Sequence, residues 1–165
     1  MSCESFGYLK RSISLKIIDL EAHFFTEEYL EYLRARTEVP RLETVEDERH
    51  EKSEQPSYGP GLHLPHRITL KYLLDLREGR MREMDAAGID MQVLSLSNPG
   101  PKAFEDPSEA TALAKKINDE LSKIIRKYAD RFIGLAALAP QVPDVAADEL
   151  SNSWGMSPMI PPQKV

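Results

Sequence analysis

A carboxylate and an imidazole stand two residues apart near the start of the sequence. Glu21 and His23 lie in the segment LEAHF, at the end of a short apolar run. Side chains at positions i and i+2 of a strand point to the same side of a sheet. Such a pair can bind one divalent metal ion, because imidazole suits zinc and carboxylate suits zinc, manganese or magnesium. The pair predicts part of a metal site, with zinc favoured. The alternative is an ion pair, or a surface histidine beside a surface glutamate.

Other residues that often do chemistry give weaker signals. His63 and His66 are three residues apart, but no cysteine or carboxylate motif supports a zinc site there, so both are interpreted as loop histidines. His50 lies in a charged run and is interpreted as solvated. The one cysteine, Cys3, excludes an intrachain disulfide.

Hydrophobic spacing indicates the elements that would position the candidate ligands. Residues 1–15 form a polar leader, and the apolar run at 16–21 predicts a buried strand. Thr26 is placed to cap a helix over 27–33, whose first turn is acidic. The candidate ligands would then stand at the carboxyl end of the first strand, where parallel α/β sheets bind ligands.

Residues 38–66 interrupt this pattern. Most residues from 38 to 54 are charged, and the stretch that follows is rich in proline and glycine. A span of this length without periodic apolar residues is uncommon inside a compact domain. It is predicted to be either a lid over the site or a disordered insert.

Regular spacing returns after the insert. Apolar residues predict a helix over 68–87 that ends at Gly88, and then a strand at 91–96. The segment Asn98-Pro99-Gly100-Pro101 breaks that strand sharply.

A long amphipathic helix is the clearest local signal in the chain. Asp106 is its predicted N-cap, and Glu109 completes a pattern like a capping box. An apolar stripe then runs to Tyr128. Residues 131–138 predict a third strand, and residues 144–150 begin a further helix.

This alternation of strands and helices predicts an α/β protein with a parallel sheet. The strands are continuous apolar runs, which is typical of strands that are covered on both faces. The sequence has no GxGxxG, GxxxxGK[ST] or GxSxG motif, so nothing points to a nucleotide or a serine nucleophile. A closed (β/α)8 barrel generally needs ~250 residues, and the chain has 165.

The composition of the chain limits its possible binding partners and its cellular location. The net charge of −6 provides no basic stripe for nucleic acid. No apolar run approaches the ~20 residues that span a bilayer, so no membrane partner is expected. The N-terminus lacks the uninterrupted apolar region of a signal peptide, and with a single cysteine the expected location is cytoplasmic.

Three stretches of the chain resemble one known family. Residues 16–24 (KIIDLEAHF) are similar to its first strand, which carries a Glu-x-His or His-x-His metal motif. Residues 80–95 (RMREMDAAGIDMQVLS) are similar to its helix-to-strand signature. INDEL at 117–121, followed by YADRFIGLAAL at 128–138, is similar to the pattern before and through its third strand. Over roughly residues 16–150 the chain thus resembles the N-terminal part of the amidohydrolase-related decarboxylases, which include aminocarboxymuconate-semialdehyde decarboxylase and the ortho-hydroxybenzoate decarboxylases.

The resemblance implies an incomplete (β/α)8 barrel, about the first three βα units, with a long charged loop after the first strand. It implies one divalent metal, zinc before manganese or magnesium, with Glu21 and His23 as ligands. Phe24 and Asn98 would border the pocket of a small aromatic carboxylate, which the metal would orient for loss of carbon dioxide. The family also implies a homo-oligomer.

The sequence departs from the family in its second half. The family's remaining ligands, a histidine from about the fifth strand and an aspartate from the eighth, have no counterpart. Residues 151–165 are rich in proline and lack an apolar period, so a disordered tail foreign to the family is expected. The chain is therefore expected to be a truncated, poorly stable and inactive decarboxylase. The alternatives are a hydrolase of the same superfamily, in which the metal activates water, and a non-catalytic fragment that pairs with a full-length relative.

Overall fold

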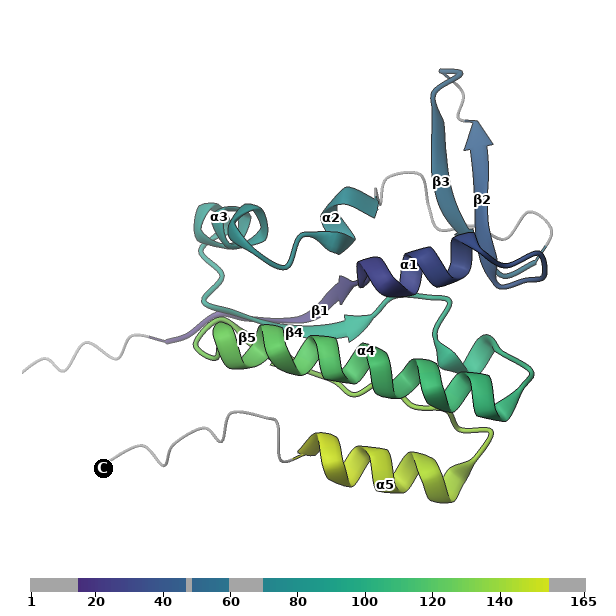
Figure 1. The fold of residues 1–165 in the computed structure, drawn as a ribbon. Coiled ribbons are helices and arrows are strands. Elements are labelled where there is room, and N and C mark those ends of the chain that lie inside the picture. The colour runs from purple at the N-terminus through teal and green to yellow at the C-terminus, as the bar shows by residue number, and fades with distance from the viewer. Residues whose placement is uncertain (1–14, 47–48, 60–69, 155–165) are drawn as a thin grey trace, which may run out of the picture.

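The computed structural model describes residues 15–46, 49–59 and 70–154 of the chain. Within them, three parallel strands form one sheet in the order β1 (Ile18–Phe24), β4 (Met91–Leu96) and β5 (Phe132–Gly134) (Figure 1). The predicted α/β class and parallel sheet are confirmed. The described strands do not close into a barrel, because β1 and β5 remain at the two edges.

The three strands follow the sequence-based expectations unevenly. The strand predicted at 91–96 is confirmed to the residue, whereas β1 begins two residues late and continues to Phe24. The third strand is much shorter than 131–138. The last backbone hydrogen bond between β5 and β4 runs from Leu135 N–H to the Leu94 carbonyl (2.9 Å). The next N–H that would point to β4 belongs to Ala137 and is bonded to a side chain. The N–H of Ala137 donates to Asn118 Oδ1 (2.8 Å) instead of to a strand.

Two of the helices begin at residues whose side chains cap them. Thr26 Oγ1 accepts the N–H of Tyr29 (3.1 Å), and Asp106 Oδ1 accepts the N–H of Ser108 (2.8 Å), so both predicted N-caps are confirmed. The carboxylate of Glu109, expected in a capping box, accepts hydrogen bonds from Tyr32 and Arg36. The helical elements are α1 (Glu27–Arg34), α2 (Leu70–Leu74), α3 (Glu78–Ala87), the 3-10 turn η1 (Pro101–Ala103), α4 (Pro107–Lys127) and α5 (Pro143–Trp154).

The single helix predicted over 68–87 is wrong, because α2 and α3 are separate helices. Asp75 Oδ1 accepts the N–H of Arg77 (3.0 Å), and the Asp75 carbonyl accepts Arg80 Nε (2.8 Å). Local bonds of this kind compete with the helical ladder and favour a turn. The end of α3 follows the prediction, since Gly88 caps it with φ +70°, a left-handed conformation that glycine adopts at little cost.

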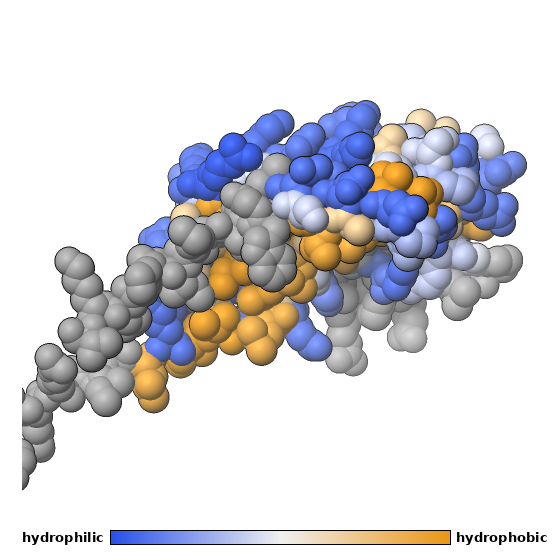
Figure 2. Space-filling model, turned by 90° about the horizontal axis from the view of Figure 1, so that it is seen from below, coloured by the Kyte–Doolittle hydropathy of each residue, from blue (hydrophilic) through white to orange (hydrophobic). Residues whose placement is uncertain are grey.

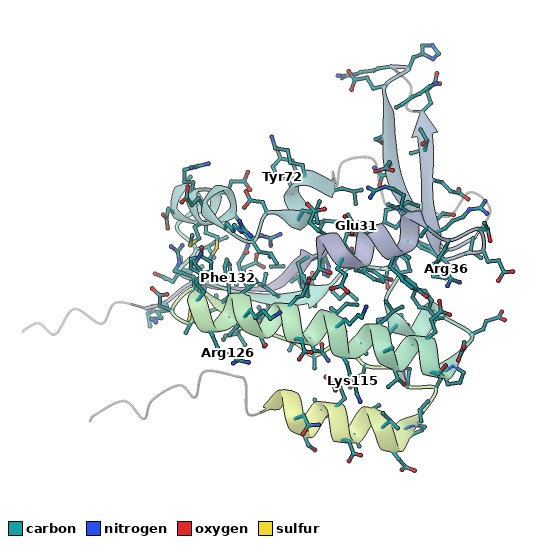
Figure 3. All side chains as sticks on the ribbon, in the orientation of Figure 1. Glu31, Arg36, Tyr72, Lys115, Arg126 and Phe132 are labelled. Carbon is teal, nitrogen blue, oxygen red and sulfur yellow. The ribbon has the colours of Figure 1, made fainter. Side chains whose placement is uncertain are left out.

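Most of the segment predicted as a lid or disordered insert is an antiparallel hairpin. The strands β2 (Arg41–Glu46) and β3 (Lys52–Ser57) pair throughout and project from the body of the molecule (Figure 1). Arg36, labelled in Figure 3, anchors the base of the hairpin through its bond to the Pro40 carbonyl (2.8 Å) and its ion pair with Glu109. The sequence analysis did not predict these strands, because the span lacks an apolar alternation. Glu54 of β3 forms an ion pair with Arg34 of α1. His63 and His66 lie outside the described residues.

The core lies between one face of the sheet and the helices. Phe24, Leu94 and Phe132 point into it and are fully buried (Phe132 is labelled in Figure 3). The helix α4 packs closely on β5, because a Cβ added to Gly134 would come within 2.2 Å of Ile125 Cδ1. The helices contribute Leu30, Leu33, Met84, Ile117 and Leu121 to the same core.

The opposite side of the sheet is open in this chain. Leu20 is 69% exposed, Leu135 52% and Ile18 43%. Figure 2 shows hydrophobic residues gathered in one area of the surface in the view from below. The expectation that both faces of the strands are covered is therefore wrong for the described residues.

The last described helix continues into the segment that was expected to be a disordered tail. Residues 144–150 were expected to begin a helix, and α5 runs from Pro143 to Trp154. The first four residues of the segment expected to be a disordered tail are thus helical, and the remainder lies outside the described residues. No helix in the described part of the chain is long and apolar enough to cross a membrane.

Candidate functional site

Glu21 and His23 both lie on exposed positions at the carboxyl end of β1. Exposure alternates along this end of the strand, with Ala22 and Phe24 buried and the two candidate ligands exposed. A bulge between Asp19 and Ala22 shifts the register of β1 against β4. The alternation from Glu21 onward nevertheless places both candidate ligands on the open side of the sheet, away from the core.

The imidazole of His23 is held by the neighbouring strand. His23 pairs in register with Ser95, and its Nδ1 lies 2.9 Å from Ser95 Oγ. None of the described residues bonds its Nε2, and none forms an ion pair with Glu21. A histidine ligand commonly has its second ring nitrogen fixed in this manner, which sets the tautomer and the orientation of the ring. Ser95 is thus a partner of a candidate ligand that the sequence reasoning missed.

The donor set at this position is small. A carboxylate oxygen and an imidazole nitrogen on one face are a combination that zinc and manganese both accept. Within residues 15–46, 49–59 and 70–154, however, no group of three or more His, Cys, Asp or Glu side chains is placed to hold a metal ion. The described residues therefore fit a divalent metal as part of a ligand set.

Phe24, expected to border the substrate pocket, lies elsewhere. Its side chain is completely buried in the core. Since it alternates with His23 along β1, it points to the opposite side of the sheet. The structure therefore places Phe24 away from the surface that carries the candidate ligands.

Asn98, the other expected pocket residue, is exposed in the loop that follows β4. This loop adjoins the end of β1, because Ser97 N–H donates to the Phe24 carbonyl (3.0 Å). The loop is also bonded to α1, because the buried hydroxyl of Tyr29 donates to the Pro99 carbonyl (2.5 Å). Burial raises the pKa of Tyr29, so its hydroxyl remains a donor at every ordinary pH.

A cavity of about 340 Å³ lies on the other side of the sheet. It is bounded by α2, α3 and β4, and Tyr72, Arg80 and Gln92 are among its lining residues. Neither Glu21 nor His23 borders it. Burial has the largest effect on the pKa of Arg80 and lowers it. The guanidinium nevertheless stays protonated in proteins.

The motifs that carry the resemblance support the fold. Asn118, in the INDEL segment, is buried and donates to the Ala137 carbonyl (2.9 Å) and to Glu149 (2.8 Å). In the segment at 80–95, Met84 lies in the core and Asp85 pairs with Arg131 (2.7 Å). These contacts give Met84, Asp85 and Asn118 structural roles in the fold.

The chain was compared with protein families, curated proteins and solved structures. No protein-family model matches the chain. The gamma-resorcylate decarboxylase of Rhizobium sp. (strain MTP-10005) is 42% identical over 80 residues, which are 48% of this chain and 24% of that enzyme. The chain therefore matches about a quarter of the length of its curated relatives.

Solved structures extend the similarity over most of the chain. A dihydroxybenzoic acid decarboxylase from Polaromonas sp. JS666, with bound manganese and the inhibitor 2-nitroresorcinol, is 31% identical with a TM-score of 0.60. The match covers 83% of this chain and 34% of that one. A 5-carboxyvanillate decarboxylase from Novosphingobium aromaticivorans, complexed with manganese and a nitrobenzoic acid, is 31% identical with a TM-score of 0.61, over 84% of this chain and 38% of that one.

These similarities confirm the resemblance inferred from the three stretches of sequence. The chain is similar, over one part of their length, to decarboxylases of aromatic carboxylic acids. The similarity is to one part of those proteins, since the chain spans less than two fifths of the length of the solved structures.

Proposed function

We propose that this chain provides the first-strand ligands of a divalent-metal site for non-oxidative decarboxylation of a small aromatic carboxylate. One observation carries the proposal: Glu21 and His23 share the open side of β1 at its carboxyl end, with the His23 ring fixed by Ser95. The relationship to gamma-resorcylate and dihydroxybenzoate decarboxylases supports a hydroxybenzoate as the substrate class.

A bound divalent ion supplies positive charge that holds the carboxylate of a substrate and its neighbouring hydroxyl. The Glu21 carboxylate would offset part of that charge, and His23 would offer Nε2, the nitrogen that Ser95 leaves free. The sequence favoured zinc. Two related structures hold manganese, so manganese is the first metal to test and zinc the second.

We infer further that the three parallel strands are part of a (β/α)8 barrel. The helices α3 and α4 contact one side of the sheet only, and the apolar side chains on its other side lack a cover within the described residues. Further strands of a barrel would fill that side with layered side chains. The incomplete metal site agrees with this arrangement, because catalytic zinc sites usually have three protein ligands.

The chain alone is therefore expected to bind metal weakly and to lack turnover. The test is a titration of the purified 165-residue chain with Mn²⁺, in which electron paramagnetic resonance reports the free ion. Weak binding is expected, and Glu21→Gln together with His23→Gln should abolish it. A matched control, Glu31→Gln with His50→Gln, changes the same residue types at exposed positions elsewhere.

The same samples decide the activity. Release of carbon dioxide from 2,6-dihydroxybenzoate should equal a blank that contains the metal alone. Turnover above that blank would refute the inactivity of the isolated chain. Equal Mn²⁺ binding by the wild type, the ligand variant and the control would refute the metal site.

A further inference from the structure

The two candidate ligands are joined by hydrogen bonds that pass behind the strand carrying them. Asp19 Oδ1 accepts the backbone N–H of Glu21 (3.1 Å), and Asp19 Oδ2 accepts Nε2 of Gln92 (2.9 Å). Gln92 Oε1 in turn accepts Nη1 of Arg80 (3.3 Å). Arg80 Nη2 closes the series by donating to the backbone carbonyl of His23 (2.8 Å). One chain of side chains thus links the backbones of both ligands.

The guanidinium at the centre of this series is anchored on two further elements. Arg80 Nη2 also donates to the Tyr72 carbonyl in α2 (2.8 Å), and Nε donates to the Asp75 carbonyl in the turn before α3 (2.8 Å). Arg80 itself belongs to α3. Figure 3 shows Tyr72 on α2, on the side of the sheet where α3 also lies. The helix layer is therefore bonded directly to the strand end that presents the ligands.

The backbone at this point needs such support. The register of β1 against β4 shifts between Asp19 and Ala22, so the regular ladder does not set the position of Glu21. The strand is also an edge of the sheet formed by the described residues. A guanidinium suits the task, because its donors form a rigid planar fork that can bind several acceptors in fixed directions.

We propose that Arg80, acting with Gln92 and Asp19, is the positioning residue of the metal site. It sets the separation and direction of the Glu21 and His23 side chains from the far side of the sheet, without touching the metal. This inference rests on the proposed metal site. It assigns a role to Arg80 and Gln92 that their place in a helix-to-strand motif did not indicate.

The test uses the full chain, Mn²⁺ as the probe, and three single variants. Arg80→Lys keeps the charge but removes the fork. Gln92→Met keeps the approximate volume but removes both bonds of the side chain. Arg131→Lys is the matched control, because the Arg131 side chain likewise donates to backbone carbonyls, those of Asp90 (3.0 Å) and Ile89. Its other bond goes to Asp85, and among the described residues its side chain does not contact Glu21, His23 or the side chains that link them.

Partners of metal ligands typically contribute about 10–100-fold in metal affinity. We expect Arg80→Lys and Gln92→Met to weaken Mn²⁺ binding by about tenfold or more on that scale. Arg131→Lys should leave the affinity within about twofold of the wild type, a change of less than ~0.5 kcal/mol. Urea denaturation of all three variants separates loss of folding from loss of metal, since Arg80→Lys and Arg131→Lys should destabilise comparably.

A second measurement needs no metal. Hydrogen exchange of the Glu21 amide should lose its protection in Gln92→Met and keep it in Arg131→Lys. If Arg80→Lys does not fold, Gln92→Met decides the matter by the same two measurements. Wild-type Mn²⁺ affinity in both Arg80→Lys and Gln92→Met, with an unchanged Glu21 amide, would overturn the positioning role. Mn²⁺ binding that does not change when Glu21 and His23 are replaced would instead overturn the proposed metal site. In that case the exchange rate of the Glu21 amide would still test whether Gln92 and Asp19 hold the backbone of Glu21.

Discussion

The two faces of the three-stranded sheet are built from similar residues and have opposite environments. On the helix side, Phe24, Leu94 and Phe132 have no exposed surface. On the open side, Leu20 and Leu135 are more than half exposed and stand beside the polar pair of Glu21 and His23. The helix side carries the stability of this chain, because apolar surface stabilises a fold only where it is removed from water. The open side carries the two proposed metal ligands.

The largest expected difference compares one leucine on each face. Leu94→Ala removes a completely buried side chain, and such changes cost about 2–5 kcal/mol of unfolding free energy. Leu135→Ala alters a side chain that is 52% exposed, and exposed substitutions usually stay within about 0.5 kcal/mol. Urea denaturation followed by circular dichroism measures both. Equal losses would mean that the open face is covered, for example by a second copy of the chain.

A glycine on the helix side gives the next largest effect. In Gly134→Ala the new Cβ would lie 2.2 Å from Ile125 Cδ1 and 2.8 Å from Leu121 Cδ2. Overpacking of a filled core costs about 1–3 kcal/mol. The control is Gly100→Ala, where φ is −110° and the nearest atom, Leu96 Cδ2, would be at 3.6 Å. Thermal denaturation should give the control a clearly higher melting temperature than Gly134→Ala. The opposite order of melting temperatures would refute the close packing of α4 on β5.

Two asparagines extend the comparison to polar groups. Asn118 is buried and joins α4 to the backbone of Ala137 in both directions. Asn118→Ala leaves those backbone groups without partners, which costs about 2 kcal/mol. Asn98→Ala at an exposed loop position should stay within about 0.5 kcal/mol. Similar denaturation midpoints for both variants would contradict the structural role given to Asn118.

The smallest effect on stability is expected at the site itself. Glu21→Gln and His23→Gln change exposed side chains, so each should alter the unfolding free energy by less than about 0.5 kcal/mol. The same variants should lose Mn²⁺ binding. A large loss of stability on either change would show that the pair supports the fold, and would remove the contrast between the two faces.

Local sequence signals predicted the elements whose causes lie within a few residues. The N-cap of α4 depends on Asp106 and Ser108, and the end of α3 depends on the left-handed conformation of Gly88. The placement of Glu21 and His23 on one side also follows from a local rule, since strand side chains alternate. These features could be predicted because their stabilising contacts are short in sequence.

Contacts between distant residues decided the rest. The third strand ends early because Asn118, nineteen positions away, takes the backbone amide of Ala137. The helix predicted over 68–87 divides where the turn at Asp75 binds Arg80. The hairpin of β2 and β3 was missed because its strands lack an apolar alternation, and the partner of Glu54 is Arg34 on α1, twenty positions earlier. No periodicity in the sequence reports such pairings.

The sequence by itself determined the alternation of strands and helices, the kinship with aromatic-acid decarboxylases, and the two side chains suited to a metal. Only the tertiary structure decided which face of the sheet is covered, and that Phe24 belongs to the core while His23 belongs to the open side. It also brought Arg80 to the carbonyl of a residue 57 positions earlier. The physical reason is the same throughout: spacing fixes the direction of a side chain relative to its own element, and packing fixes what that side chain meets.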